Sequence, residues 1–331
     1  MGELVGRDSI AAAARTLEGV VVTTPLVSAP WLSEELGAEI RLKCENLQRA
    51  GAFKIRGAYT ALARQPDAAR ARGVIAYSSG NHAQGVALAA RLFGVRAVVV
   101  MPTTAPAVKV EGARRLGAEV ILEGTTSLER QKRAEAEAAE RGLTIVPAFD
   151  DRDIIAGQGT VGREILAQWP EVETVLVPIG GGGLISGVAA WLRSERPSCR
   201  VIGVEPENAD AMARSIAAGA PVTITPKPTI VDGLMPVRPG DITFAHVRDL
   251  VHDIILVTDE EIAAATARLL GTGKLVVEFS GAATVAALLS GRFEPDGRRT
   301  VAVLSGGNLD PARALTLLNP VATASPVAAP A

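Results

Sequence analysis

The chain has 331 residues, 48% of them hydrophobic, and its formal net charge at pH 7 is −2. This length favours about two domains with sizeable cores, and a near-neutral charge without a long basic run argues against nucleic acid as the main partner. The two cysteines, Cys44 and Cys199, are too few for a disulfide framework, which favours a reducing compartment. The start of the chain shows no signal-peptide pattern, and no apolar run approaches the ~18 residues of a membrane helix. We therefore expect a cytoplasmic protein that binds neither membrane nor nucleic acid.

From Val74 the sequence alternates between short β-branched runs and helical patterns. The first series predicts strands over residues 74–79, 95–102, 118–124 and 143–149, and helices over 82–94, 107–117 and 127–141. Continuous apolar strands that alternate with helices of about ten or more residues indicate βαβ units and a parallel sheet covered on both faces. This series predicts a small α/β unit.

A second series follows the first. It predicts strands over residues 174–179, 200–206, 253–258 and 300–305, and helices over 153–169, 184–195, 259–270 and 280–290, with a further helix ending at Ala218. Thr258 and Glu261 have the spacing of a capping box. Residues 321–331 are rich in Pro and Ala and are predicted to be disordered. The fold class predicted is α/β, with two open, mainly parallel twisted sheets flanked by helices.

A run of glycines, Gly180–Gly183, lies between a predicted strand and a predicted helix. Glycine permits close backbone approach, so successive N–H groups together with the positive end of the helix dipole can bind a phosphate. The run lacks the Gly-Lys-Ser/Thr ending of a Walker loop. It also matches the dinucleotide fingerprint poorly, although Glu205 stands at a strand end some distance on. The alternative is a loop whose glycines permit tight helix–sheet packing.

Two further turns have related features. In the stretch "AYSSGNHAQG", Ser78 and Ser79 end a strand and a helix opens near Asn81 or His82, which suits a carboxylate. Ser and Asn acting as ordinary helix N-caps are the alternative. In "AVLSGGNLD", Ser305 stands at a strand end, where its hydroxyl can bind a ring nitrogen; a plain turn is the alternative there.

Lys54 stands between Phe53 and Ile55 at the expected start of a helix. Desolvation by these neighbours lowers the pKa of a lysine and provides the free amine that forms a Schiff base. Taken alone, a structural lysine is the better interpretation. Together with a phosphate site, a carboxylate site and a ring-nitrogen contact, however, Lys54 indicates pyridoxal 5′-phosphate (PLP) as the cofactor and an amino acid as the small-molecule substrate.

Six segments occur in an order and at intervals that resemble the fold type II PLP enzymes, in particular the threonine/serine dehydratase and serine racemase branch. They are "AGAFKIRGA", "SSGNHAQG", "IAGQGT", "GGGGLISG", "GVEPENA" and "LSGGN". The resemblance implies PLP in a cleft between two domains: a large discontinuous domain of residues 1–73 plus 149–320, and a small inserted domain of residues 74–148. It also implies a homo-oligomer, a dimer or a tetramer.

The resemblance assigns roles motif by motif. It gives catalytic roles to Lys54, which binds the cofactor aldehyde and transfers the Cα proton, and to Ser79, which stands where racemases have their second acid/base. It implies cofactor contacts from Phe53, Lys54, Asn81, Gly180, Gly181, Gly182, Gly183, Leu184 and Ser305. It implies a substrate-carboxylate site formed by Ser78, Ser79, Asn81 and His82. Glu278 matches a glutamate near the cofactor ring.

Members of this branch often bind a divalent cation (Mg2+, Mn2+ or Ca2+) in the segment matching "GVEPENADA". Glu205 and the carbonyl of Ala209 match the first two ligand positions, but the third is Ala211, which has no carboxylate. Hard cations require several oxygen ligands. The cation is therefore a doubtful second cofactor, and ordinary loop carboxylates are the alternative.

The leading functional interpretation is an ammonia-lyase that eliminates water from L-threonine or L-serine and yields a 2-oxoacid and ammonia. A serine racemase or a hydroxyaspartate dehydratase of the same fold is the close alternative. A sulfhydrylase is less favoured, because such enzymes carry a threonine where this chain has His82. A non-catalytic PLP or amino-acid binding protein is the alternative from another functional class.

Overall fold

The computed structural model of the protein describes residues 4–318, so the tail predicted to be disordered lies outside the described residues. The strands are β1 (Leu26–Ser28), β2 (Ile40–Cys44), β3 (Val74–Tyr77), β4 (Ala97–Met101), β5 (Glu119–Leu122), β6 (Thr144–Ile145), β7 (Thr174–Pro178), β8 (Arg200–Pro206), β9 (Asp253–Val257) and β10 (Thr300–Leu304).

The α-helices are α1 (Arg7–Thr16), α2 (Pro30–Leu36), α3 (Lys54–Arg64), α4 (Asp67–Ala71), α5 (Asn81–Phe93), α6 (Ala107–Arg115), α7 (Ser127–Arg141), α8 (Arg152–Gln168), α9 (Gly183–Glu195), α10 (Ala211–Ala218), α11 (Asp241–Leu250), α12 (Asp259–Gly271), α13 (Phe279–Leu289) and α14 (Pro311–Leu318). Short 3-10 helices are η1 (Glu45–Leu47), η2 (Arg49–Gly51), η3 (Glu207–Ala209) and η4 (Asp232–Leu234).

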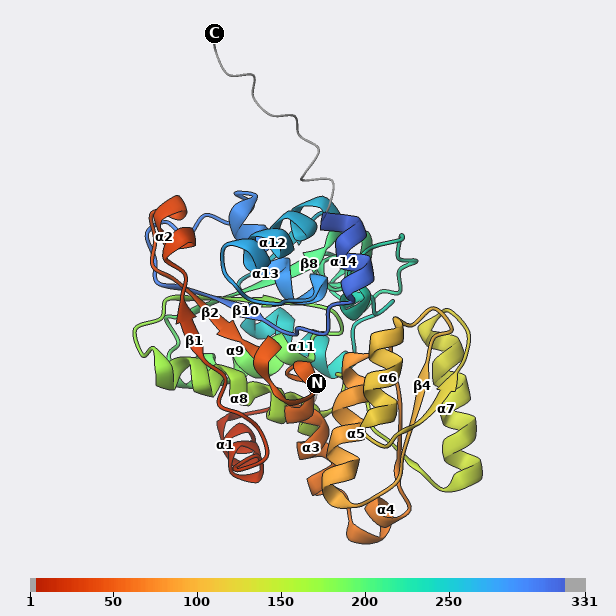
Figure 1. The fold of residues 1–331 in the computed structure, drawn as a ribbon. Helices are drawn as coiled ribbons and strands as arrows, with labels where there is room; N and C mark the ends of the chain where they lie inside the picture. The colour runs from red at the N-terminus through yellow and green to blue at the C-terminus, as the bar shows by residue number, and fades with distance from the viewer. Residues whose placement is uncertain (1–3, 319–331) are drawn as a thin grey trace.

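The strands form two sheets, as the sequence predicted (Figure 1). A six-stranded sheet has the order β1-β2-β10-β7-β8-β9, and a four-stranded sheet has the order β5-β4-β3-β6. Neighbouring strands pair in parallel except β1 with β2, which are antiparallel. The predicted class of two mainly parallel sheets flanked by helices is confirmed.

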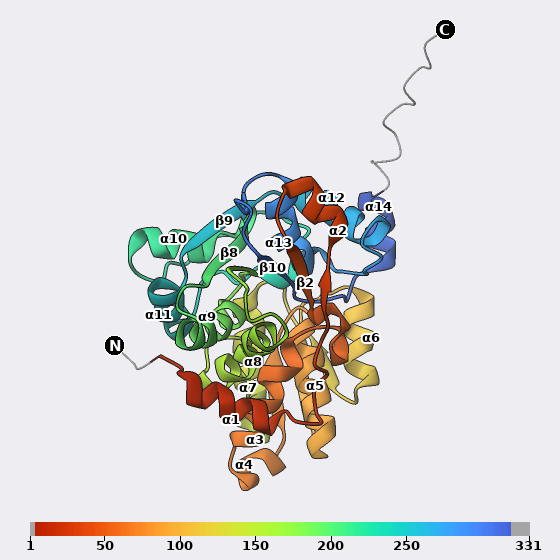
Figure 2. The same cartoon turned by 90° about the vertical axis from the view of Figure 1, so that its left-hand side faces the viewer.

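Helices cover both faces of the six-stranded sheet (Figure 2). Side chains of a strand alternate between faces, so Leu176 of β7 packs with α12 and α13, whereas Val175 and Val177 pack with α8, α9 and α11. The capping box predicted for Thr258 and Glu261 begins α12. This sheet contains the strand ends that precede the Gly180–Gly183 loop and Ser305.

The four-stranded sheet is likewise enclosed. Ala76 of β3 faces α3, α5 and α6, and Ile75 faces α7. Helix α3 also approaches α8 closely, because a Cβ at Gly157 would lie 2.4 Å from the carbonyl oxygen of Arg56. Helix α3 therefore joins the two halves of the molecule and positions its first residue, Lys54, between them.

The domain boundaries remain a prediction. All four strands of the smaller sheet fall within residues 74–148, but α3, which precedes that range, buries Ile55 and Leu62 in the core of this sheet. Among residues 4–318, no helix combines the length and the apolar character needed to cross a membrane.

Candidate functional site

Lys54 begins α3, and two backbone hydrogen bonds hold the segment before it against the end of β10. The N–H of Phe53 donates to the carbonyl of Ser305 over 3.2 Å. The N–H of Gly307 donates to the carbonyl of Gly51 over 2.8 Å. Two segments about 250 residues apart along the chain, the lysine motif and the "LSGGN" turn, therefore lie together, in keeping with the edge of a parallel sheet where the carboxyl ends of strands meet.

The side chain of Lys54 is half-buried. Its Nζ donates to the backbone carbonyl of Ala148 over 2.9 Å and lies 5.1 Å from the centroid of the Phe53 ring. Burial lowers the pKa of Lys54 from 10.5 to about 8. The amine is therefore partly uncharged near neutral pH, which is the form that adds to an aldehyde.

Arg56, two residues further along, shows the opposite behaviour in a buried position. Its guanidinium forms ion pairs with Glu45 over 2.8 Å and with Glu164 over 2.6 Å. Burial alone would lower the pKa of Arg56, but the two carboxylates outweigh it and raise the pKa. Arg56 therefore keeps its charge and fixes α3, while Lys54 is disposed to lose its charge.

The Gly180–Gly183 loop connects β7 to α9 and is lined by one aromatic ring. A Cβ at Gly181 would lie 2.2 Å from the ring of Phe149, and a Cβ at Gly183 would lie 3.1 Å from the Phe149 Cα. Gly182 has a φ of +91°, which disfavours residues with a side chain. Because Phe149 follows Ala148, whose carbonyl accepts from Lys54, the loop and the lysine share one structural support.

Contacts on the other side of the loop fix it to the six-stranded half. The Thr243 hydroxyl of α11 donates to the Gly181 carbonyl over 2.7 Å. A Cβ at Gly180 would lie 3.1 Å from the Cα of Leu234. Leu184, the second residue of α9, is buried in the core with α11. Here the sequence requires glycine for close packing as well as for the backbone conformation of Gly182. The packing interpretation of the loop therefore holds, and phosphate binding remains a prediction.

Ser78 and Ser79 follow β3, and α5 begins at Asn81. The Ser78 hydroxyl accepts from the N–H of Gly80 over 3.1 Å. The Ser79 hydroxyl donates to the backbone carbonyl of Asp232 over 3.0 Å, which connects the start of α5 to η4 of the other half. The start of α5 therefore presents hydroxyls and a positive helix end at the same place, an arrangement suited to a carboxylate.

Asn81 lies beside the "LSGGN" turn. Its Nδ2 donates to Glu278 Oε1, and its Oδ1 accepts from Asn308 Nδ2 over 3.0 Å. A Cβ at Gly306 would lie 3.2 Å from Asn81 Nδ2. The first residue of α5 therefore adjoins the turn that follows Ser305.

His82 is buried beneath the start of α5. Its Nε2 lies 3.0 Å from the carbonyl of Val146, so Nε2 carries the proton, and its Nδ1 has no hydrogen-bond partner in residues 4–318. Burial, with a smaller effect of the Lys54 charge, lowers the pKa of His82 to about 3. Gly85, also on α5, allows the backbone of Lys54 to approach this helix. A Cβ at Gly85 would lie 3.0 Å from the carbonyl carbon of Lys54.

These residues fit PLP by their chemistry. Lys54 offers an uncharged amine, the Gly180–Gly183 loop offers closely packed backbone at a helix start, and the α5 start offers hydroxyls for an amino acid. The Nδ1 atom of His82 is buried at the start of α5 and has no hydrogen-bond partner within residues 4–318, so it can accept a hydrogen bond from a bound ligand. The individual contacts of Phe53, Ser305 and the other predicted residues with the cofactor remain predictions.

Several residues around the site were not singled out from the sequence. Asn308 is the last residue of the segment "LSGGN", and Phe149 ends the predicted strand over residues 143–149, but the sequence analysis gave neither residue a role. Lys109 and Asp232 form an ion pair over 2.6 Å, and both lie in stretches without a motif. Glu278, noted from the resemblance, is buried and directly contacts Asn81.

The predicted cation segment lies at the end of β8. The Glu205 carboxylate is buried and accepts from the N–H groups of Met212 and Ala213, each over 2.9 Å, so it caps the first turn of α10. Within residues 4–318, no three His, Cys, Asp or Glu side chains are grouped as metal ligands. Cation binding by Glu205 and the Ala209 carbonyl therefore remains a prediction.

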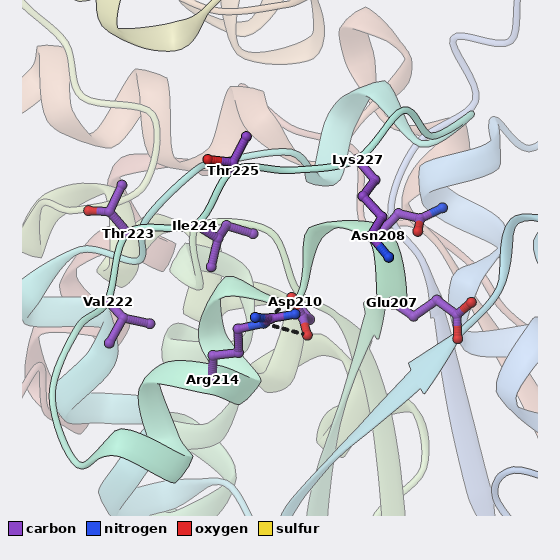
Figure 3. Close-up of a pocket in the computed structure, with 9 residues that line it drawn as sticks. All are labelled: Glu207, Asn208, Asp210, Arg214, Val222, Thr223, Ile224, Thr225 and Lys227. Carbon is purple, nitrogen blue, oxygen red and sulfur yellow. Dashed lines mark hydrogen bonds and ion pairs between the residues drawn. The ribbon is translucent and has the colours of Figure 1, made fainter.

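A surface hollow of about 330 Å³ adjoins this segment (Figure 3). The Asp210 carboxylate and the Arg214 Nε, both in its lining, form an ion pair in which both N···O distances are 2.8 Å. Its lining residues are Glu207, Asn208, Asp210, Arg214, Val222, Thr223, Ile224, Thr225 and Lys227. The hollow is thus built from residues other than those of the Lys54 site.

Comparisons with known proteins agree with this geometry. The chain is 46% identical over 307 residues to the L-threonine ammonia-lyase of Thermotoga maritima, covering 93% of this chain and 76% of that protein. It is 41% identical over 306 residues to the L-threo-3-hydroxyaspartate ammonia-lyase of a Pseudomonas species, covering 92% and 96%. The structure of maize serine racemase superposes with a TM-score of 0.91 at 38% identity, covering 97% of this chain and 98% of that one.

The family described as "Pyridoxal-phosphate dependent enzyme" matches residues 17–306. This range includes Lys54, the Gly180–Gly183 loop, the start of α5 and the turn after β10. The chain therefore belongs to the pyridoxal-phosphate dependent enzymes.

Proposed function

We propose that this protein is an ammonia-lyase that eliminates water from L-threonine, and from L-serine, to give a 2-oxoacid and ammonia. The observation that carries the proposal is the half-buried Lys54 amine, which donates to the Ala148 carbonyl and has a pKa lowered to about 8 by desolvation. The similarity to an L-threonine ammonia-lyase over most of both chains supports the choice of substrate.

Bound PLP supplies the electron sink that acidifies the Cα–H of an amino acid. Lys54 would hold the cofactor, and the Gly180–Gly183 loop at the start of α9 would bind its phosphate. Ser305, at the end of β10, would contact the ring nitrogen, and Phe53 would lie against the ring. A serine hydroxyl at the ring nitrogen, unlike a carboxylate, would place no negative charge there, a setting compatible with loss of the β-hydroxyl.

The substrate carboxylate would bind at the start of α5, where Ser78, Ser79 and Asn81 precede or begin the helix. His82 stays neutral there because its pKa is about 3, so it contributes hydrogen bonding and no charge. Lys54 would take the Cα proton, and that proton would leave with the β-hydroxyl as water. The released enamine then hydrolyses to the 2-oxoacid and ammonia.

The same arrangement supports a second candidate, a racemase or a hydroxyaspartate dehydratase. A serine racemase and a hydroxyaspartate ammonia-lyase are both among the similar proteins, and Ser79 offers a hydroxyl for a second proton transfer. A non-catalytic binding protein is the alternative from another class, and the presence of both Lys54 and Ser79 argues against it.

The test is an assay of the PLP-loaded protein with L-threonine, L-serine, D-serine and L-threo-3-hydroxyaspartate, each measured separately. The proposal requires 2-oxobutyrate from L-threonine, with a kcat/KM higher than that for hydroxyaspartate. If oxaloacetate formed from hydroxyaspartate were the main product, the assigned substrate would change to hydroxyaspartate. Inversion of serine without net oxoacid would favour the racemase. Lys54→Ala is the negative control.

We further propose that the protein acts in the cytoplasm as a homo-oligomer. The scarcity of cysteines and the resemblance to oligomeric enzymes support these two statements. Light scattering of the purified protein measures its molar mass and therefore its oligomeric state.

A further inference from the structure

A buried ion cluster connects the small-sheet half of the molecule to the other half. Lys109, on α6, is 2% exposed, and its Nζ lies 2.6 Å from Asp232 Oδ2 and 2.9 Å from Glu278 Oε2. Asp232 begins η4, and Glu278 is the residue before α13. One ammonium group therefore bridges two carboxylates from the half that contains the six-stranded sheet.

Each carboxylate residue also binds one predicted site residue. The second oxygen of Glu278, Oε1, accepts from Asn81 Nδ2. The backbone carbonyl of Asp232 accepts from the Ser79 hydroxyl over 3.0 Å. Each partner of Lys109 thus holds one residue at the start of α5: Asp232 holds Ser79, and Glu278 holds Asn81 together with Asn308.

The path of the Lys109 side chain adds a third connection to the same helix start. A Cβ at Gly80, the residue between Ser79 and Asn81, would lie 2.3 Å from Lys109 Cδ. The aliphatic part of Lys109 therefore packs directly on the turn that precedes α5. Glycine at position 80 makes this packing possible.

The charges explain why a lysine is needed here. The buried Glu278 carboxylate and the partly exposed Asp232 carboxylate approach one point, and without a cation they would repel each other. Burial alone would lower the pKa of Lys109, but the charges of Glu278 and Asp232 outweigh it and raise the pKa. Lys109 therefore stays charged, whereas Lys54 on α3 is disposed to lose its proton.

We propose that Lys109 is a positioning residue that fixes Ser79 and Asn81 through Asp232 and Glu278, and so sets the geometry of the substrate-carboxylate site. The functional part of this proposal rests on the proposed function, since it takes Ser79 and Asn81 to face substrate and cofactor. The structural part, that Lys109 immobilises the start of α5, does not depend on it.

The experiment compares full-length Lys109→Met with Lys109→Arg and with Lys132→Met. Methionine keeps the unbranched apolar part of the side chain as far as Cε and removes the charged amine, and arginine keeps the charge. Lys132 is exposed on α7 of the same half and is the matched control. Two quantities are measured: hydrogen–deuterium exchange without cofactor, and the Kd for PLP from absorbance titration.

We expect Lys109→Met to accelerate exchange of residues 79–84 by about tenfold relative to Lys132→Met, with α7 unchanged, because the loss is local. We expect its Kd for PLP to rise roughly tenfold, because the groups at the start of α5 are misplaced. Lys109→Arg keeps the positive charge, so we expect smaller changes in both the exchange rate and the Kd for PLP. Exchange over 79–84 equal to that of the control would overturn the proposal, and so would equal acceleration in α7, which would indicate a general structural role.

If Lys109→Met does not fold, Asp232→Asn replaces it, because this change keeps the shape and removes one ion pair. We then expect faster exchange than in the control at residues 79–81 and an unchanged exchange rate in α7. An equal acceleration in both segments would overturn the proposal. Failure of the proposed function is seen separately, as a wild-type protein that binds no PLP or forms no oxoacid, while the exchange comparison still decides the role of Lys109.

Discussion

The Nζ of Lys54 donates a hydrogen bond to the backbone carbonyl of Ala148 over 2.9 Å. Ala148 precedes Phe149, whose ring packs against Gly181. The amine at the start of α3 is therefore aligned with the glycine loop through two consecutive residues. A cofactor bound by both would be held at its aldehyde and its phosphate by one continuous support.

The lowered pKa of Lys54 predicts how fast the apoprotein reacts with PLP at different pH values. Because the uncharged amine is the nucleophile, the rate of covalent attachment should rise with pH and level off above about 8, rather than near 10.5. Stopped-flow absorbance over this pH range measures the rate. A midpoint near 10.5 would show that burial does not perturb Lys54.

The same shift predicts the pH dependence of stability. The folded-state pKa lies below the unfolded value, so between pH 8 and 10.5 the unfolded apoprotein binds more protons than the folded one. The contribution of Lys54 therefore makes the apoprotein more stable as pH rises through this window. Denaturant unfolding should show this rise in wild type and its reduction in Lys54→Ala; identical pH profiles would contradict the prediction.

Gly181→Ala tests the close packing of the loop. Its Cβ would overlap the ring of Phe149, so we expect a loss of roughly 1–3 kcal/mol of stability and weaker PLP binding. Gly271→Ala is the matched control, since a Cβ there meets no atom within 4 Å outside its own helix and chain neighbours. Thermal unfolding and PLP titration measure the two effects. If Gly181→Ala had the same stability and the same affinity for PLP as the control, the cofactor phosphate would have to bind outside this loop.

Ser79→Ala separates elimination from inversion. In the proposed elimination Lys54 moves the Cα proton, so turnover of L-threonine should fall by no more than about tenfold. Any inversion of serine should fall at least about 100-fold, the usual contribution of a general acid or base. Chiral chromatography and an oxoacid assay follow the two reactions, with Ser194→Ala as control. Equal losses in both reactions would give Ser79 a role in elimination too.

Introducing a carboxylate at position 211 tests the predicted cation site. Glu205 already binds the N–H groups of Met212 and Ala213, and Ala211 offers no oxygen from its side chain. We expect Ca2+ to raise the Tm of Ala211→Asp more than that of wild type, because the added carboxylate supplies a missing ligand. Glu205→Gln in the same background should remove the gain. An equal response of wild type and Ala211→Asp would refute a shared site.

The parts of the fold that the sequence predicted well are those with local signals. Strands such as Ala97–Met101 are continuous β-branched runs bounded by Gly and Pro, and they formed where expected. β1 and β2 were not assigned, because β1 has three residues and β2 contains Arg41 and Lys43. The charge of Lys43 is compensated by Glu164, 121 residues away in the chain, which no local pattern reveals.

The site shows the same division. Lys54 and the glycine loop could be selected as candidates because their neighbours along the chain already imply desolvation and a helix start. Lys109 could not, because its acidic partner Asp232 is 123 residues away and lies in a segment without regular periodicity. Its role depends on a tertiary contact between the two halves.

The most direct test of the account is reduction of the PLP-loaded protein with borohydride, followed by peptide mass mapping. Reduction makes the bond between cofactor and lysine permanent, so the modified lysine can be identified. We predict that the mass increase lies on the peptide containing Lys54, that Lys54→Ala shows none, and that the unreduced wild type forms 2-oxobutyrate from L-threonine. Modification of another lysine, or cofactor retained covalently by Lys54→Ala, would contradict the central claim.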